Sequence, residues 1–430
     1  MGTNTNELMN ARNDFITNYP HFRYWKKNIV DEMVSLKPLN IYIHIPFCIQ
    51  KCSYCYYMTT KYRNQSEVNS FINALLKEIK LVAQKFNLKN RPVNSVYFGG
   101  GTPALLKTDQ LKQILDCLNE YFVINNAEIT IESEPRLILR DKVIEYKSLG
   151  INRISIGVQS FCDDIIKLSG RNHTGEQVHK AINIINEIGD ILINIDLLSG
   201  LHGETKETWD KTVDIAIRSD VQNITIYKMQ TYANTVFFDK EVRKGIISLP
   251  STNEELEFME LALDKMEISN YKLWSTFTFT KDGKYPQIYV SNIWNGEESI
   301  ALGPSAFGLL NNYCYQNTNN FEMYITSLEE SQLPINRSYL LSSKDLMIRD
   351  VLLGMKFQTF DCQLFYKKHG VKFSDLIPET MNELSSQNFL QIYDKTIELT
   401  KKGILYGDYV GKQISLSLKQ KLGIDIYSLS

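Results

Sequence analysis

Three cysteines lie close together near the start of the chain, at Cys48, Cys52 and Cys55, with the spacing C-x3-C-x2-C. This spacing supplies three thiolates to an iron–sulfur cluster of four irons, so one iron keeps a position for a small molecule. A fourth protein ligand would close a structural site, whereas catalysis requires an open position. The triad therefore indicates an enzyme. The spacing also fits a zinc loop completed by His44, or a set of redox thiols.

The remaining composition limits the class of protein. Four further cysteines are scattered singly along the 430 residues, which suggests no disulfide framework and fits a reducing cytoplasm. The N-terminal residues are polar and no apolar run reaches the length of a membrane span, so we expect neither secretion nor membrane insertion. A net charge of -2 offers no basic field that would attract nucleic acid.

The elements that position the triad follow from short β-branched runs that alternate with longer helical stretches. This pattern is typical of βα units around a parallel sheet. The predicted strands are 40–45, 95–98, 128–132, 153–158, 191–198 and 223–227, and the predicted helices are 66–86, 108–121, 140–149, 175–188 and 206–218. Six such units predict an α/β fold with a partial (β/α)6 TIM-like barrel, whose site lies at the C-terminal ends of its strands.

Alternation within these strands predicts which side chains face the barrel interior. In the first strand, three isoleucines share one face, and Tyr42 and His44 share the other. The same alternation places Glu132, Gln159 and Asp196 on the polar face of later strands. Because parallel strands are normally covered on both faces, polar side chains that collect late in each strand indicate a site.

The second predicted strand ends in three glycines, Gly99, Gly100 and Gly101, followed by Thr102 and Pro103. Glycine lets the backbone approach a ligand closely and adopt positive φ. A tight turn into a helix that begins near the proline would explain the run equally well.

Taken together, these residues resemble the radical S-adenosylmethionine (SAM) enzymes, and more narrowly the branch of oxygen-independent coproporphyrinogen III oxidase. The resemblance is strong over 42–201 and weaker over 292–308, and the C-terminal region is similar to the small winged-helix-like domain of that branch. The matching residues, in order, are the run 42–48 (YIHIPFC), the three cysteines, the run 99–103 (GGGTP), Glu132, the run 157–161 (GVQSF), Arg171 and Asp196.

The resemblance implies a 4Fe-4S cluster held by Cys48, Cys52 and Cys55, with SAM chelated at the open iron and cleaved on one-electron reduction. It also implies a small-molecule substrate, a flavodoxin or ferredoxin as electron donor, and a monomer. Arg171 is expected to pair with the SAM carboxylate. The full set of residues expected to bind SAM is Tyr42, Tyr54, Gly100, Gly101, Thr102, Glu132, Gln159, Arg171 and Asp196.

Two departures from the family pattern bear on the reaction. Tyr57 stands where the decarboxylating oxidases have a further cysteine, and the segment 291–294 (SNIW) lacks the histidine that haem-chaperone relatives carry there. A histidine is the obvious axial ligand for haem iron. The chain is therefore predicted to resemble the methyltransferases and cyclopropane-forming enzymes of the branch, which look able to bind two SAM molecules.

By the same resemblance, Ile293, Trp294 and Phe307 are expected to form the second SAM pocket, alongside Tyr42 and His44. His44, with Tyr42 beside it, is the candidate catalytic residue, because imidazole titrates near neutrality and can carry a proton. A buried core histidine with satisfied hydrogen bonds is the alternative.

The predicted function is a radical SAM enzyme that transfers a methyl or methylene carbon to a natural product or tetrapyrrole. The alternatives are an oxidative decarboxylase similar to coproporphyrinogen III oxidase, and a haem or tetrapyrrole carrier with a structural cluster. We expect an N-terminal arm at 1–38, the barrel with its extension at 39–335, and a C-terminal helical, winged-helix-like domain at 336–430. The aromatic segment 18–25 either covers the barrel mouth or docks as an ordinary arm.

Overall fold

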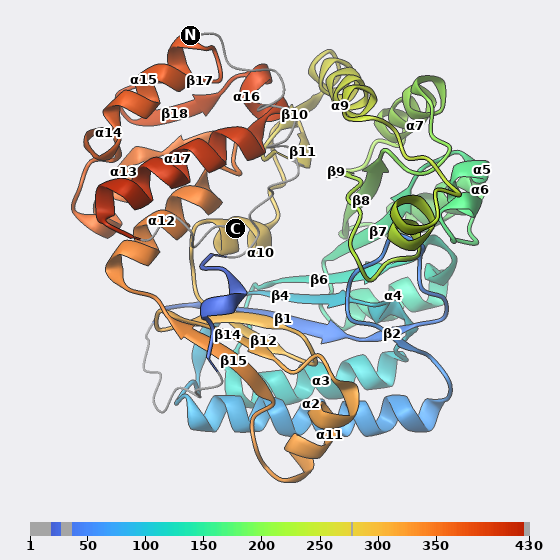
Figure 1. Cartoon of the computed structure of the whole chain (residues 1–430). Coiled ribbons are helices and arrows are strands. Elements are labelled where there is room, and N and C mark those ends of the chain that lie inside the picture. The colour runs from blue at the N-terminus through green and yellow to red at the C-terminus, as the bar shows by residue number, and fades with distance from the viewer. Residues whose placement is uncertain (1–18, 27–36, 277, 425–430) are drawn as a thin grey trace.

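The centre of the molecule is a curved parallel sheet, seen in a computed structural model that describes residues 19–26, 37–276 and 278–424 (Figure 1). Its six strands are neighbours in the sheet in the order in which they occur in the chain. They are β1 (Leu39–Ile45), β4 (Arg91–Gly100), β6 (Glu128–Ser133), β7 (Arg153–Gln159), β8 (Leu192–Ser199) and β9 (Asn223–Lys228). This order confirms the predicted partial barrel, which stays open.

Amphipathic helices connect these strands and bury their apolar faces against the sheet. They are α2 (Gln65–Lys85), α3 (Thr108–Tyr121), α4 (Arg140–Ser148), α6 (Gly175–Ile188) and α7 (Lys206–Arg218). Thr174 and Thr205 begin the last two helices, because each hydroxyl accepts a hydrogen bond from a first-turn amide in a capping box. The bounds of these helices lie within one residue of those predicted.

Both edges of the parallel sheet carry strands that the sequence did not predict. Beside β1 lie the parallel strand β12 (Ser299–Leu302) and then three antiparallel strands, β13 (Phe307–Leu310), β14 (Tyr313–Asn317) and β15 (Ile335–Leu340). Beside β9 lies an antiparallel hairpin of β11 (Thr278–Lys281) and β10 (Tyr271–Leu273). These additions enlarge the barrel wall on both sides of the site.

Shorter elements fill the connections. Close to the cysteines, β2 (Phe47–Cys48) pairs with β3 (Thr60–Lys61). The remaining elements before the C-terminal region are β5 (Phe122–Val123), α5 (Asp163–Leu168), α8 (Val236–Phe238), α9 (Thr252–Glu267), α10 (Ile288–Trp294) and α11 (Phe321–Glu329). None of the helices in the described ranges is long and apolar enough to cross a membrane.

The C-terminal region has a hydrophobic core of its own, which runs from Ile348 to Leu418. Its helices are α12 (Ser343–Gly354), α13 (Cys362–His369), α14 (Phe373–Leu376), α15 (Pro378–Ser386), α16 (Lys401–Leu405) and α17 (Gly407–Leu422), and its antiparallel sheet has β16 (Thr359–Asp361), β18 (Thr396–Leu399) and β17 (Leu390–Ile392). This matches the expected helical C-terminal region. The large sheet continues through β15 to Leu340, a few residues beyond the predicted boundary.

The described part of the N-terminal arm, 19–26, lies against the sheet extension and the C-terminal region. Phe22 stacks on Phe307 of β13 at 5.4 Å, and Lys26 forms a backbone bridge with Ser338 of β15. The Tyr19 hydroxyl donates a hydrogen bond to Asp345 at 3.1 Å. The aromatic arm therefore ties two parts of the fold together. The remainder of the predicted arm, 1–18 and 27–36, lies outside the described residues.

Candidate active site

The three cysteines of the triad lie in one loop at the C-terminal end of β1. Cys48 ends β2, whose pairing with β3 is closed by the Tyr62 amide donating to the Cys48 carbonyl at 2.8 Å. The Cys55 amide donates to the Cys52 carbonyl at 3.2 Å, which folds the second half of the loop into a turn. These backbone hydrogen bonds bring the three cysteines of the motif into one loop.

The side chains around the thiols suit an anionic iron–sulfur cluster. Burial, together with the neighbouring Cys55 and Cys52, raises the pKa of the Cys48 thiol to about 12. An Nη of Arg171 lies 3.5 Å from the Cys52 Sγ, and the Thr102 hydroxyl donates toward the Cys48 Sγ at 3.6 Å. A permanent cation and a hydroxyl donor stabilise thiolates in a site where burial alone would keep them protonated.

The zinc alternative finds no support in this geometry. Over the described residues, no three His, Cys, Asp or Glu side chains are placed to hold a single metal ion. In a 4Fe-4S cluster each cysteine binds a different iron, so the three sulfurs need not converge on one point. Both ring nitrogens of His44 also have partners, which leaves neither of them for zinc.

His44 is a buried histidine whose hydrogen bonds fix its tautomer. Its Nε2 lies 2.9 Å from the Met58 carbonyl, which only accepts, so Nε2 carries the proton. Its Nδ1 therefore accepts from the Tyr42 hydroxyl at 3.3 Å. Burial lowers the pKa of His44 to about 4, so the ring is neutral near pH 7. This geometry favours the core histidine over the proton carrier, and Tyr42 becomes the group that His44 orients.

The glycine run at the end of β4 is required by the packing of the cysteine loop. Gly100 has a φ of +110°, and a Cβ there would lie 2.7 Å from the His44 ring. A Cβ on Gly101 would lie 2.7 Å from the Phe47 carbonyl oxygen. The Gly101 amide also donates to the Ile45 carbonyl at 2.8 Å. The positive φ and the His44 ring therefore explain Gly100, and the close approach of backbone to backbone explains Gly101.

Two buried carboxylates, Glu132 on β6 and Asp196 on β8, lie in the barrel interior on strands separated only by β7. Glu132 accepts hydrogen bonds from the Tyr97 hydroxyl at 2.8 Å and the Gly100 amide at 3.1 Å. Asp196 accepts from Ser155 at 2.8 Å and from Asn194 at 2.9 Å. Burial raises the pKa of Glu132 to about 7, helped by the charge of Asp196, and burial raises the pKa of Asp196 to about 6. The pair is well placed to bind a cationic or hydroxyl-bearing ligand.

Arg171 connects the carboxylate side of the barrel to the cysteine loop. It donates to the Gly157 carbonyl at 2.8 Å and to the Tyr54 hydroxyl at 3.3 Å, in addition to its contact with Cys52. Gln159 lies at a bulge in β7 and has a φ of +68°. Its side-chain nitrogen packs against Gly157, because a Cβ added to that glycine would lie 3.1 Å from it. The structure therefore brings Tyr54, Gln159 and Arg171 together beside the triad.

The predicted residues of the second SAM pocket lie in two separate aromatic groups. Trp294, at the end of α10, stacks on Trp274 at 6.4 Å and meets Phe357 edge-on. Phe307 stacks on Phe22 of the N-terminal segment. No described contact joins the two groups, so the pocket formed by Ile293, Trp294 and Phe307 stays a prediction.

Sequence reasoning missed a group of tyrosines in the barrel interior. Tyr97 stacks on Tyr42 with ring centres 6.1 Å apart, and it packs at a tilt against Tyr289 of α10 at 5.0 Å. Burial raises the pKa of the Tyr227 hydroxyl, and the charges of the nearby Asp196 and Glu132 add to the effect, although 46% of the residue surface is exposed. Alternation gives a signal for two of them, because Tyr97 pairs in register with Tyr42 and Tyr227 shares the inward face of Thr225. Tyr289 lies on a short helix with no such signal.

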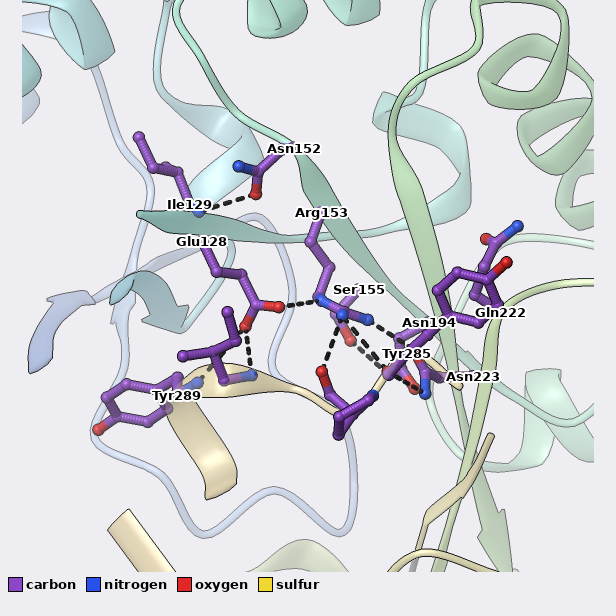
Figure 2. A network of polar contacts seen from close by, with 12 residues as sticks. Glu128, Ile129, Asn152, Arg153, Ser155, Asn194, Gln222, Asn223, Tyr285 and Tyr289 are labelled. Carbon is purple, nitrogen blue, oxygen red and sulfur yellow. Dashed lines mark hydrogen bonds and ion pairs between the residues drawn. The ribbon is translucent and has the colours of Figure 1, made fainter. Parts of the chain in front are cut away.

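The floor of the barrel is closed by a buried ion pair at the N-terminal ends of the strands (Figure 2). The Arg153 Nε donates to Glu128 at 2.9 Å, and the same guanidinium contacts Asn223 and the Pro286 carbonyl. The second Glu128 oxygen accepts from the Ile288 amide at 2.8 Å. Because α10 begins at Ile288, this carboxylate caps the helix that carries Tyr289 into the site.

Comparison with known sequences identifies the class of protein to which this fold and its cysteine triad belong. Residues 42–216 match the radical SAM superfamily. The heme chaperone HemW of Buchnera aphidicola subsp. Schizaphis graminum is 32% identical over 279 residues, which cover 64% of this chain and 71% of that protein. The chain belongs to the radical SAM superfamily, in the branch that contains HemW and oxygen-independent coproporphyrinogen III oxidase.

Other members of this branch match the chain over most of its length. HemW of Bacillus subtilis is 28% identical over 86% of this chain and 97% of that protein. The oxygen-independent coproporphyrinogen III oxidase of Helicobacter pylori strain 26695 is 26% identical over 87% of this chain and 85% of that enzyme. The solved structure of coproporphyrinogen III oxidase from Escherichia coli shares the fold with a TM-score of 0.79 at 23% identity, covering 93% of this chain and 97% of that one.

The family uses a 4Fe-4S cluster and SAM, as predicted from the triad and its surroundings. The donor set described above fits such a cluster. These similarities give no support to the predicted resemblance to methyltransferases. They agree with the two alternatives, an oxidative decarboxylase similar to coproporphyrinogen III oxidase and a haem or tetrapyrrole carrier.

Proposed function

We propose that this protein is a radical SAM enzyme that oxidises a tetrapyrrole bearing carboxylate side chains, in the manner for which its coproporphyrinogen oxidase relatives are named. The observation that carries the proposal is the group of tyrosines near Glu132 in the barrel interior. Aromatic side chains provide broad apolar faces on which pyrrole rings can pack. Relatives named for tetrapyrrole chemistry, matched over most of this chain, give independent support.

In this proposal Cys48, Cys52 and Cys55 hold the cluster, which with SAM supplies one-electron removal of hydrogen from the substrate. Arg171 neutralises negative charge beside Cys52 and binds the SAM carboxylate. Glu132 binds the cationic part of SAM, held in place by the Tyr97 hydroxyl and the Gly100 amide. The Tyr42 hydroxyl donates to the Nδ1 of His44, which holds the Tyr42 ring beside Tyr97 in the tyrosine group.

The test is anaerobic reconstitution with iron and sulfide, followed by incubation with SAM, dithionite and coproporphyrinogen III. The expected products are 5'-deoxyadenosine and a tetrapyrrole that has lost carbon dioxide, both detected by mass spectrometry. Cys52→Ala should abolish both products, and Cys362→Ala, far from the triad in the chain, should keep them. A loaded cluster that yields neither product would refute the oxidase proposal. Label carried from methyl-labelled SAM into the product would instead identify the methyl transfer predicted from the sequence.

A tetrapyrrole carrier is the second candidate, and two observations favour it. The HemW of Bacillus subtilis matches this chain over nearly its whole length, and Tyr57 replaces the further cysteine expected of the oxidases. Haem titration distinguishes the two candidates, because a Soret shift at stoichiometric haem without SAM cleavage identifies a carrier. The electron donor, the monomeric state and the cytoplasmic location stay predictions.

A further inference from the structure

A cluster of charged side chains lies where the end of β9 meets the C-terminal region. Lys228 is the last residue of β9, and its Nζ lies 2.6 Å from the carboxylate of Asp408, in the first turn of α17. Lys356 follows α12, and its main chain is fixed by the Thr276 amide, which donates to its carbonyl at 2.7 Å. The C-terminal ends of barrel strands are where substrates bind in such folds.

Two lysines and one carboxylate lie near one another at this junction. Asp408 is paired with Lys228, and the same carboxylate is the group whose charge raises the pKa of Lys356, while Lys228 lowers it. Lys356 is only 8% exposed, and burial is the main reason that its pKa falls to about 7. A second anion placed between the two lysines would therefore be favoured by both charges.

Aromatic side chains connect this junction to the cysteine loop. The Lys356 Nζ lies 5.9 Å from the centre of the Trp294 ring, which is parallel to that of Trp274. On the other side, Tyr232 packs on Tyr56 with their ring centres 4.1 Å apart. Burial raises the pKa of Tyr232, and the nearby Tyr56 and Asp408 add to the effect. Tyr56 is next to Cys55 in the chain, so this group of side chains links the cysteine loop to the neighbourhood of Asp408.

We infer that Lys228 and Lys356 form a binding site for a carboxylate of the substrate, at the junction of the barrel and the C-terminal region. This inference rests on the proposed function, because it assigns a position to one acidic side chain of the tetrapyrrole while the ring lies over the tyrosines near the triad. Asp408 is the internal anion with which the substrate carboxylate competes. The C-terminal region thus contributes directly to substrate recognition.

The test uses the reconstituted full chain and two probes with the same ring, coproporphyrin III and its tetramethyl ester, with binding followed by porphyrin fluorescence. The unmodified protein should bind the acid more tightly than the ester. A lost charge-assisted contact corresponds to roughly 10- to 100-fold in affinity. Lys356→Gln and Lys228→Gln should each weaken acid binding within this range and leave ester binding unchanged, and Lys228→Arg should retain acid binding.

Two further variants distinguish loss of the carboxylate site from misfolding of the junction. Asp408→Asn removes the competing anion, so it should tighten binding of the acid and not of the ester. Lys421→Gln, an exposed lysine near the end of α17, removes the same charge elsewhere and should change neither. Equal binding of acid and ester by the unmodified protein would overturn the carboxylate site and leave tetrapyrrole binding standing. Binding of neither probe would overturn the proposed function and the site with it.

Discussion

Removing either partner of the Glu128–Arg153 pair should destabilise the barrel. Arg153 is 1% exposed and its guanidinium keeps its charge at any working pH, so Glu128→Gln leaves an uncompensated cation in the core. Loss of one partner of such a pair costs about 3–5 kcal/mol in the free energy of unfolding. The remaining contacts of Arg153, to Asn223 and to main-chain carbonyls, do not supply the missing charge.

The opposite removal, Arg153→Met, leaves a buried carboxylate without its cation. Glu128 keeps its hydrogen bond from the Ile288 amide, which does not supply the missing charge. We therefore expect a loss of the same order, about 3–5 kcal/mol.

Urea unfolding followed by tryptophan fluorescence measures both effects, since Trp294 lies on α10, the helix that Glu128 caps. The double variant Glu128→Leu with Arg153→Met should recover part of the loss, because it buries no charge. The reasoning is refuted by a loss below about 1 kcal/mol in either single variant, or by a double variant that loses as much as the two single variants together.

Three further outcomes test the site. Burial raises the pKa of Glu132 to about 7, and SAM is expected to bind the ionised form, so SAM affinity measured by calorimetry should rise with pH up to about 7, by at most tenfold per pH unit. The affinity of Glu132→Gln should not change with pH. A flat profile in the unmodified protein contradicts this prediction. Gly100→Ala should lower the free energy of unfolding by about 1–3 kcal/mol, because the new Cβ clashes with His44. Gly189→Ala is the matched control and should cost less, since Gly189 also has a positive φ but has open space around it. Equal shifts of the melting temperature in the two variants would disprove the clash. Cys52→Ala should lose the visible absorbance of the reconstituted cluster, whereas alanine at any cysteine outside the triad should keep it, and an unchanged spectrum in Cys52→Ala would exclude its role as a ligand.

The parallel barrel was predictable because its signals are local. Helix bounds follow from capping residues such as Thr174 and Thr205, and buried strands follow from apolar runs of fixed length. The strands at both sheet edges were missed, since β12 to β15 are short and depend on pairing between segments far apart in the sequence. Their residues form strands mainly because a neighbouring strand is already present.

The candidate site shows the same contrast between features with local sequence signals and features that depend on long-range packing. Alternation along β1, β6 and β8 is enough to place Tyr42, Glu132 and Asp196 in the interior, and the cysteine spacing is enough to identify the cluster loop. The partners that set their properties were not predictable. The Met58 carbonyl that fixes the His44 tautomer comes from a loop, and Tyr289 reaches the site only because a buried carboxylate caps α10. Such contacts depend on how segments pack, which no local pattern encodes.

The docking of the N-terminal segment also sets an order for folding on the ribosome. Tyr19 donates its hydroxyl hydrogen bond to Asp345, 326 residues later in the chain, and Phe22 packs on Phe307. The central strand β1 likewise gains its second neighbour only when β12 has been made. Translation proceeds at about 5–20 residues per second, so these aromatic side chains wait on the order of tens of seconds for their partners. Throughout that interval the nascent chain presents exposed aromatic surface, which is a binding target for chaperones.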